Sequence, residues 1–181
     1  YREFVAADRR MPNHAHVYHY AAYLFRLSDL LDAGIQAERR GIELDTTSPW
    51  ACFGMIRLQL LHGDRAAATH WLEQARRRFP AHYRIPMYEA GILVDQGRYE
   101  EALALFEARV PETRMEGRHY FDRAFASLMT GRRDKAMAWT GQYESFAAVD
   151  MDHAADAAAL WAHLGDPDKA FRLLDRAVQL G

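Results

Sequence analysis

The sequence predicts an all-α protein built from repeated helix-turn-helix units that stack into a solenoid. The first observation is a fixed period of 34 residues between small residues, at Gly34, Ala68, Ala102, Ala136 and Ala170. The second is a turn column five residues earlier, formed by Asp29, Gly63, Gly97, Gly131 and Gly165. The third is an apolar column twelve residues before the first, formed by Ala22, Ile56, Ala90, Ala124 and Ala158. Three columns with one period and no insertion indicate a repeat array.

Each unit contains amphipathic helical patterns. Within residues 98–109, apolar side chains recur at intervals of three and four residues, which gives one apolar stripe. Glu100 and Glu101 lie outside this stripe, and adjacent helical side chains diverge by about 100 degrees. They are therefore expected on the solvent-facing surface, and an acidic active-site helix is not expected here.

Turn residues separate the two helices of a unit. The glycines of the turn column suit a left-handed residue that closes the first helix. Asp64 and Asp166 then follow as N-caps of the second helix, and Pro167 fits a first helical turn. The first helices are expected near residues 14–28, 48–62, 82–96, 117–130 and 151–164. The second helices are expected near residues 30–44, 64–78, 98–110, 132–147 and 167–180, with Pro111 ending the third of them.

This pattern resembles the tetratricopeptide repeat (TPR), a helix-turn-helix unit of 34 residues. The stretches LLHGDRAAATHWLEQARRRFP at 60–80 and VDQGRYEEALALFEARV at 94–110 carry the resemblance most fully. The first stretch has the turn glycine, packing alanines, large apolar residue and closing proline of the family at Gly63, Ala68, Ala75, Leu72 and Pro80. Thr46 replaces the closing proline in the first full unit, and Thr140 replaces the large apolar residue in the fourth.

The whole chain is interpreted as a single TPR array. Phe4, Ala7 and Pro12 have the phases of a second helix, so residues 1–12 are expected to end a preceding repeat, and the natural protein is expected to continue upstream. Five repeats follow at 13–46, 47–80, 81–114, 115–148 and 149–181.

The resemblance implies a right-handed superhelix whose first helices line a concave groove. The outward phases of those helices predict a peptide-binding surface of His19, Tyr20, Tyr23, Arg26, Trp50, Phe53, Arg57, Arg84, Met87, Tyr88, Arg118, Phe121, Asp122 and Phe125. Aromatic and arginine side chains dominate binding hot spots, and guanidinium groups pair with carboxylates. The hypothesis is an extended peptide with apolar side chains and at least one carboxylate. The alternative is that several of these rings only fill the core between repeats.

Catalytic and metal sites are not expected. His14, His16 and His19 lie close in sequence, but no neighbouring Asp, Glu or Cys completes a ligand set. Cys52 is the only cysteine, which excludes an intrachain disulfide, and its phase suits a buried structural thiol. No glycine-rich phosphate loop or serine nucleophile motif is present. The sequence therefore predicts neither a cofactor nor enzyme activity.

Composition limits the partner classes. A formal net charge of −2 argues against a nucleic-acid binder, and the apolar stretches are too short for membrane insertion. The single cysteine favours a reducing, cytoplasmic compartment, with the periplasm as the alternative because the chain does not begin with Met. The predicted function is a scaffold with protein or peptide partners. The alternative is a regulatory or sensory segment of a larger bacterial protein, because HLGDPDKAFRLLDRAVQLG at 163–181 looks like the last units that follow effector domains, with the groove used intramolecularly.

Overall fold

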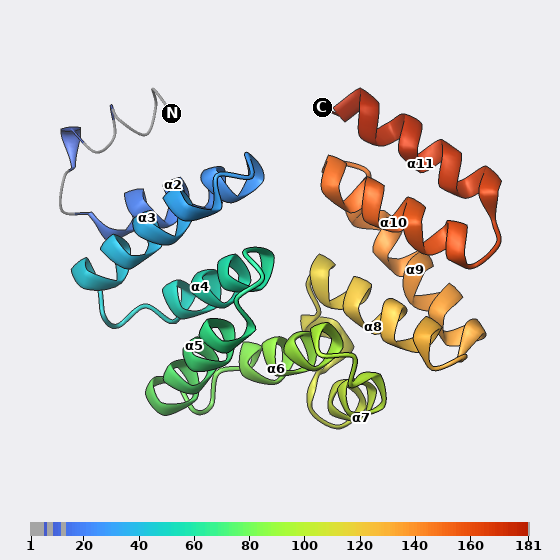
Figure 1. The fold of residues 1–181 in the computed structure, drawn as a ribbon, viewed down its shortest axis with the longest axis horizontal. Coiled ribbons are helices and arrows are strands. Elements are labelled where there is room, and N and C mark those ends of the chain that lie inside the picture. The colour runs from blue at the N-terminus through green and yellow to red at the C-terminus, as the bar shows by residue number, and fades with distance from the viewer. Residues whose placement is uncertain (1–5, 7–8, 12–13, 181) are drawn as a thin grey trace. The chain divides into compact units, whose positions relative to one another are not determined.

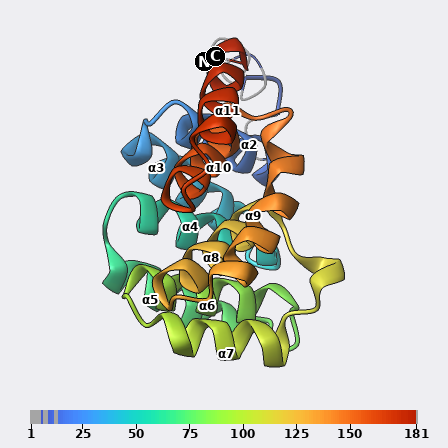
Figure 2. The ribbon, with the colours of Figure 1, turned by 90° about the vertical axis from the view of Figure 1, so that its right-hand side faces the viewer.

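The structure is a computed structural model that describes residues 6, 9–11 and 14–180. Within these residues every regular element is a helix, as Figure 2 also shows. The prediction of a preceding second helix over 1–12 rests on Phe4, Ala7 and Pro12, which lie outside the described residues.

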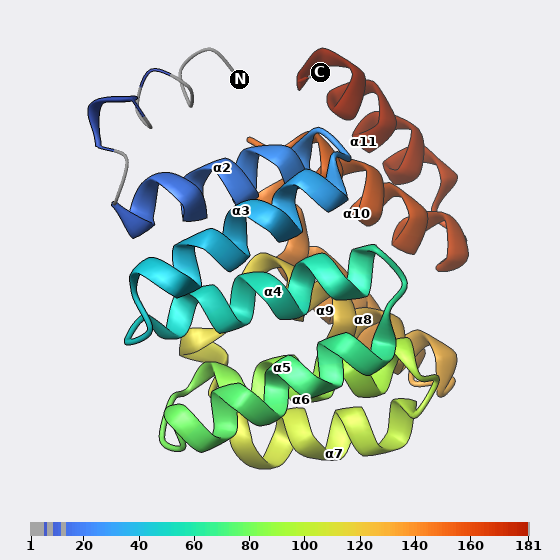
Figure 3. The same ribbon diagram turned by 60° about the vertical axis from the view of Figure 1, so that its left-hand side comes forward.

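The chain divides into two compact units, residues 1–88 and 89–181, and the division falls inside one helix, α6 (Arg84–Asp95). The first unit contains α2 (Ala15–Leu27), α3 (Leu31–Leu44), α4 (Pro49–Leu61) and α5 (Arg65–Arg78), which follow one another in Figure 3. The second contains α7 (Tyr99–Arg109), the 3-10 turn η1 (Glu112–Arg114), α8 (Gly117–Met129), α9 (Arg133–Ala147), α10 (Met151–His163) and α11 (Pro167–Leu180), labelled in Figure 1. The predicted all-α helix-turn-helix class is confirmed, and every predicted helix end lies within two residues of the observed one.

The turn column has the backbone conformation that its residues predict. Gly63 and Gly97 have φ angles of +83° and +75°, and Gly131 and Gly165 behave in the same way. Asp29, the non-glycine member of the column, also adopts a left-handed φ of +56°. Asp tolerates this conformation better than most residues, so all five units turn by the same geometry.

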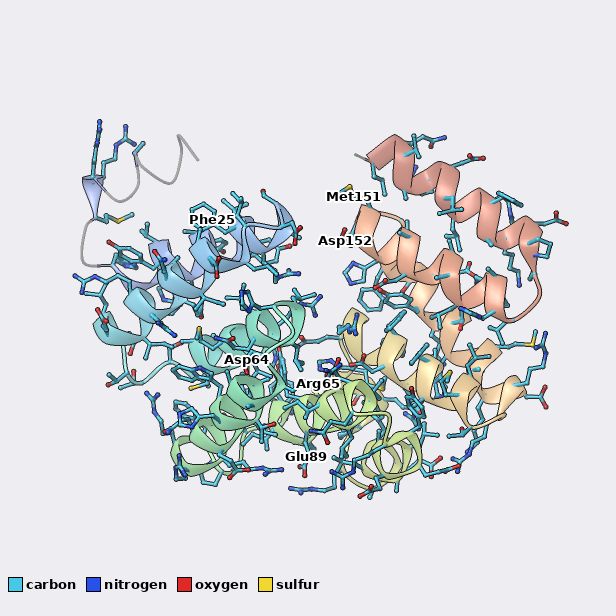
Figure 4. All side chains as sticks on the ribbon, in the orientation of Figure 1. Phe25, Asp64, Arg65, Glu89, Met151 and Asp152 are labelled. Carbon is cyan, nitrogen blue, oxygen red and sulfur yellow. The ribbon has the colours of Figure 1, made fainter. Side chains whose placement is uncertain are left out.

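Carboxylates begin two of the second helices, α5 and α11. Asp64 Oδ1 accepts a hydrogen bond from the Ala67 amide at 2.8 Å, and Asp166 Oδ1 accepts one from the Lys169 amide at 3.1 Å. Figure 4 labels Asp64 at the start of α5. These contacts satisfy amides that have no partner within the helix, so the predicted capping roles of both residues are confirmed.

Small side chains lie where helices approach most closely. Ala68, Ala102 and Ala136 are buried, as is Ala170. In the first unit Ala21, Ile35 and Met55 form a core between α2, α3 and α4, and in the second Ala124, Tyr143 and Leu160 join α8, α9 and α10. Thr140 is also fully buried, and its hydroxyl donates to the Ala136 carbonyl at 2.8 Å. This bond satisfies the polar group inside the helix, so the least regular repeat still packs.

Candidate functional site

In the first unit, Arg84 of the predicted surface lies next to two aromatic rings, Trp50 and Tyr83. The Arg84 guanidinium carbon lies 4.0 Å from the centroid of the half-exposed Trp50 ring. Arg84 Nε also donates to the Tyr83 hydroxyl at 3.3 Å. Stacking on an aromatic face attracts a cation and holds it in place. The first helices α4 and α6 thus present a positive charge on a fixed aromatic platform.

Two of the predicted surface residues of the first unit are not on its surface. Phe53 and Met87 are fully buried, although both were predicted to line the groove. The Phe53 ring stacks on Tyr88 with centroids 5.0 Å apart and an interplanar angle of 14°. The prediction is therefore corrected for Phe53 and Met87. Their phases point into the packing between helices, where Phe53 supports the partly exposed Tyr88 ring.

Arg57 lies on α4, one turn beyond Phe53, and its side chain is only partly exposed. Its Nε atom is buried and has no hydrogen-bond partner among the described residues. Leaving a buried donor of a charged group unpaired costs about 1–3 kcal/mol or more. The Arg57 Nε hydrogen therefore has no acceptor in the described part of the chain, and the side chain reaches the surface only in part.

The helix α2 contributes exposed aromatic side chains. Tyr20 and Tyr23 are both exposed, and the Arg26 guanidinium carbon lies 5.0 Å from the centroid of the Tyr23 ring. These three residues occupy the surface as predicted by their phases. Their arrangement repeats the pairing of an arginine with an aromatic face seen at Arg84.

His19 has a different role from the predicted one. Its side chain is mostly buried, and Nδ1 lies 3.2 Å from Oε1 of Glu38 on α3, whose side chain is buried as well. Glu38 stands at the repeat position that carries Leu72 and Phe106 in later units. Burial raises the pKa of the Glu38 carboxyl, and its contact with His19 partly offsets this by lowering it. The pair is thus a polar insertion into an apolar position of the repeat.

Two glycines make room for the His19–Glu38 pair. A Cβ added at Gly54 would lie 2.7 Å from Glu38 Oε1, and one added at Gly41 would lie 2.5 Å from His19 Cε1. Later repeats carry side chains at both positions, with Tyr88 in the Gly54 column and Ala75 in the Gly41 column. This pair was not among the predicted sites. A glutamate in a column that carries Leu72, Phe106 and Leu174 in other repeats was the signal that could have found it.

Gly41→Ala is expected to destabilise the first unit, because the new methyl group overlaps the buried His19 ring. The matched control is Gly141→Ala on α9, where an added Cβ meets no atom within 4 Å. The control should gain about 0.5–1 kcal/mol from the better helix propensity of alanine. Thermal unfolding of both variants checks the prediction. A Gly41→Ala protein at least as stable as the wild type would contradict the close packing.

In the second unit, an ion-pair cluster surrounds Arg118 on α8. Its Nε lies 3.0 Å from Asp122 Oδ1, and its Nη1 lies 3.8 Å from Asp156 Oδ2 on α10. Asp156 Oδ2 also accepts a hydrogen bond from the Tyr143 hydroxyl at 3.2 Å. The Arg118 guanidinium carbon lies 4.5 Å from the centroid of the Phe121 ring. Arg118 is therefore already matched by carboxylates of its own unit, which the sequence pattern did not predict.

Burial and charge act in opposite directions in this cluster. Desolvation raises the pKa of Asp156, and the Arg118 charge and the Tyr143 hydrogen bond partly counter this. Desolvation opposes the charge of Arg118 as well, but Asp122 and Asp156 keep the pKa of its guanidinium above the ordinary value. Asp122 is almost completely buried, so its predicted place in the groove is corrected to a support for Arg118.

Two aromatic rings extend this surface along α8. Phe121 and Phe125 stack with centroids 5.9 Å apart and an interplanar angle of 5°, and both are partly exposed. Figure 4 labels Asp152 at the start of α10, where it is exposed. The second unit thus combines flat apolar rings with carboxylates, whereas the first unit combines rings with arginines.

The placement of possible metal ligands and of Cys52 can be described for residues 14–180. No group of three or more His, Cys, Asp or Glu residues is placed there to hold a metal ion. Cys52 is fully buried with Arg78 Nη1 3.7 Å from its Sγ, and desolvation raises the pKa of the thiol. None of the helices described is both long and apolar enough to cross a membrane.

The glutamates at the start of α7 form surface ion pairs. Glu100 Oε2 lies 2.5 Å from Arg132 Nη2, and Glu101 Oε2 lies 2.6 Å from Arg98 Nη2. Both carboxylates are more than half exposed, which agrees with the expected solvated positions.

Repeated helix-turn-helix units with a left-handed turn and alanine contacts define a helical-repeat protein, and solved structures identify the type of repeat. A TPR protein of Thermus thermophilus is 19% identical, with a TM-score of 0.72, over 92% of this chain and 91% of that one. One from Parabacteroides merdae is 13% identical, with a TM-score of 0.73, over 98% and 70%. YrrB, described as a TPR protein with an unusual peptide-binding site, is 19% identical, with a TM-score of 0.53, over 98% and 91%.

The chain therefore has the tetratricopeptide-repeat fold. No model of a known protein family matches the sequence, and no curated protein sequence matches it significantly.

Proposed function

We propose that this protein is a non-catalytic interaction scaffold that binds an extended peptide or protein segment on its first helices. The observation that carries the proposal is Arg84, whose guanidinium carbon lies 4.0 Å from the centroid of the half-exposed Trp50 ring. Fold alone does not define function, so the proposal rests on this side chain and its surroundings.

The first unit offers the features of a hot spot for an acidic, partly apolar segment. Arg84 is held on the Trp50 ring, and Tyr20 and Tyr23 are exposed on α2. Rigid rings bury much area at little cost in conformational entropy, and arginine forks bind carboxylates. The likeness to YrrB, whose description names a peptide-binding site, supports a peptide ligand.

The ligand carboxylate is proposed to meet the first unit rather than Arg118. Arg118 already lies near two carboxylates, so a third acidic group there would add repulsion.

Selection from a random peptide library against the full 181-residue chain tests this function. The enriched peptides should contain aspartate or glutamate together with apolar residues. Arg57→Glu and Arg84→Glu should each weaken their binding by at least about tenfold, because each reverses the charge that meets the carboxylate.

The matched control is Arg77→Glu, which makes the same charge change at an exposed position on the second helix α5. Its affinity should stay close to that of the wild type, and circular dichroism should show equal helicity in all three variants. Equal affinities for Arg57→Glu, Arg84→Glu and Arg77→Glu would reject the proposed surface.

A further inference from the structure

The connection between α9 and α10 carries the same chemistry as the ligand proposed for the first unit. Val149 is 83% exposed. Asp152 is exposed as well and lies in the first turn of α10, where Figure 4 labels it. An apolar side chain and an acidic one therefore lie three residues apart on the surface of the second unit.

The exposure of these two side chains follows their columns in the repeat. Three earlier members of the columns of Val149 and Asp152 are exposed although further repeats follow them: Thr47, Ala81 and Trp50. Met115 is the exception in the column of Val149, since it is buried with its Sδ atom 3.6 Å from Arg123 Nη1. A repeat placed after α11 is therefore not expected to cover Val149 or Asp152.

The backbone of this connection is held at two points. Arg176 Nη2 donates a hydrogen bond to the Ala148 carbonyl at 2.6 Å. Asp150 Oδ1 accepts one from the His153 amide at 3.0 Å and lies 2.9 Å from His153 Nδ1. A segment that is fixed before it binds loses less conformational entropy on binding. The connection therefore presents its outward side chains in a prepared arrangement.

The two units carry opposite net charges. Residues 1–88 contain 12 basic and 9 acidic residues, whereas residues 89–181 contain 11 basic and 16 acidic ones. The contrast also appears within one repeat column, because Asp152 follows Arg84 by 68 residues, which is two repeat periods. Opposite charges favour contact between the first unit of one copy and the second unit of another, and like charges disfavour contact between identical units.

We propose that a second copy of this chain is a ligand of the first unit, and that residues 148–152 of that copy bind beside Arg84 and Trp50. The Asp152 carboxylate pairs with the Arg84 guanidinium, and Val149 packs on the exposed part of the Trp50 ring. The contact rests on the function proposed above, because it uses the same surface. It joins two different surfaces, so each copy still offers one of them to a further copy.

Sedimentation velocity of the 181-residue chain tests this contact. Association should increase with protein concentration and weaken as salt is added. Asp152→Lys and Arg84→Glu should each weaken association at least about tenfold, because each brings like charges together. The double variant Arg84→Glu/Asp152→Lys restores opposite charges, so its association should return to within about threefold of the wild type.

Each charge reversal has a matched control. Asp134→Lys makes the same change as Asp152→Lys, at an exposed position that is also in the first turn of its helix, α9. Arg77→Glu makes the same change as Arg84→Glu, at an exposed position on α5. Both controls should associate like the wild type, and circular dichroism should show equal helicity in all variants.

A chain that stays monomeric at every concentration would overturn the self-contact, and so would association that the charge reversals leave unchanged. A monomer whose affinity for the selected peptides rises with Asp152→Lys would assign the contact to a single chain instead. The proposed function is judged separately, by whether the selected peptides lose affinity for Arg84→Glu. Its failure and the failure of the self-contact are therefore distinguishable.

Discussion

Phe106→Ala is expected to lower the free energy of unfolding of the second unit by about 3–5 kcal/mol, the cost typical of truncating a buried phenylalanine. Phe106 is fully buried on α7. Its removal loses the transfer free energy of the ring and leaves a cavity that the helical backbone can close only in part.

The matched control is Leu174→Ala, which removes a large apolar side chain from the same repeat position on α11. Leu174 is about half exposed, so the loss should stay below about 1 kcal/mol. Urea unfolding followed by circular dichroism measures both changes, and hydrogen exchange assigns the loss for Phe106→Ala to the second unit. Similar losses for the two variants would show that burial at the repeat junction does not decide stability.

The fold could be predicted because its determinants are local and repeated. The glycine at each turn, the alanine at each close contact and the apolar stripe recur with one period, and stacking each unit on its neighbour uses the same contacts again. Asp64 and Pro167 also predicted where α5 and α11 begin, and the structure confirms both starts. Because the pattern repeats five times, a single exception such as Thr140 does not obscure it. The Thr140 hydroxyl donates its hydrogen bond within its own helix.

The candidate surface could be predicted only in part. The position of a residue in a helical turn of 3.6 residues tells the buried face from the exposed face only to within about one residue. Phe53, Met87 and Asp122 lie near the border between the two faces, so they were predicted to be exposed although they are buried. Tyr20, Tyr23 and Trp50 are exposed as their phases predict. Pairing between side chains of different helices, as in Arg118 with Asp156, depends on three-dimensional placement that a single column does not contain.

The same limit explains why the His19–Glu38 pair was missed. Glu38 lies on a second helix and His19 on a first helix, so neither residue type predicts the other. Gly41 and Gly54 complete the site from two further positions. Four departures from the repeat meet at one place, which makes this pair the strongest irregularity of the first unit.

His19→Ala is expected to destabilise the first unit by up to about 3–5 kcal/mol, because removing one partner leaves a buried carboxyl without its counter-group. The loss should depend on pH. Burial raises the pKa of Glu38 above its unfolded value, so its contribution to stability is full below the unfolded pKa and is lost as pH rises through the folded pKa. His19 lowers the pKa of Glu38, and its removal therefore raises this pKa further and enlarges the loss at higher pH.

The test compares His19→Ala with the double variant His19→Ala/Glu38→Gln, because both lack the imidazole and differ only in the ionisable group. The glutamine side chain of the double variant cannot lose a proton, so the single variant should become less stable than the double variant as pH rises from about 5 to about 8. Urea midpoints at the two pH values measure the difference. A constant gap would mean that Glu38 keeps one protonation state throughout, in which case its burial costs the fold nothing that depends on pH. A widening gap would show that, without His19, the folded state raises the pKa of Glu38 and the ionised carboxylate destabilises the first unit.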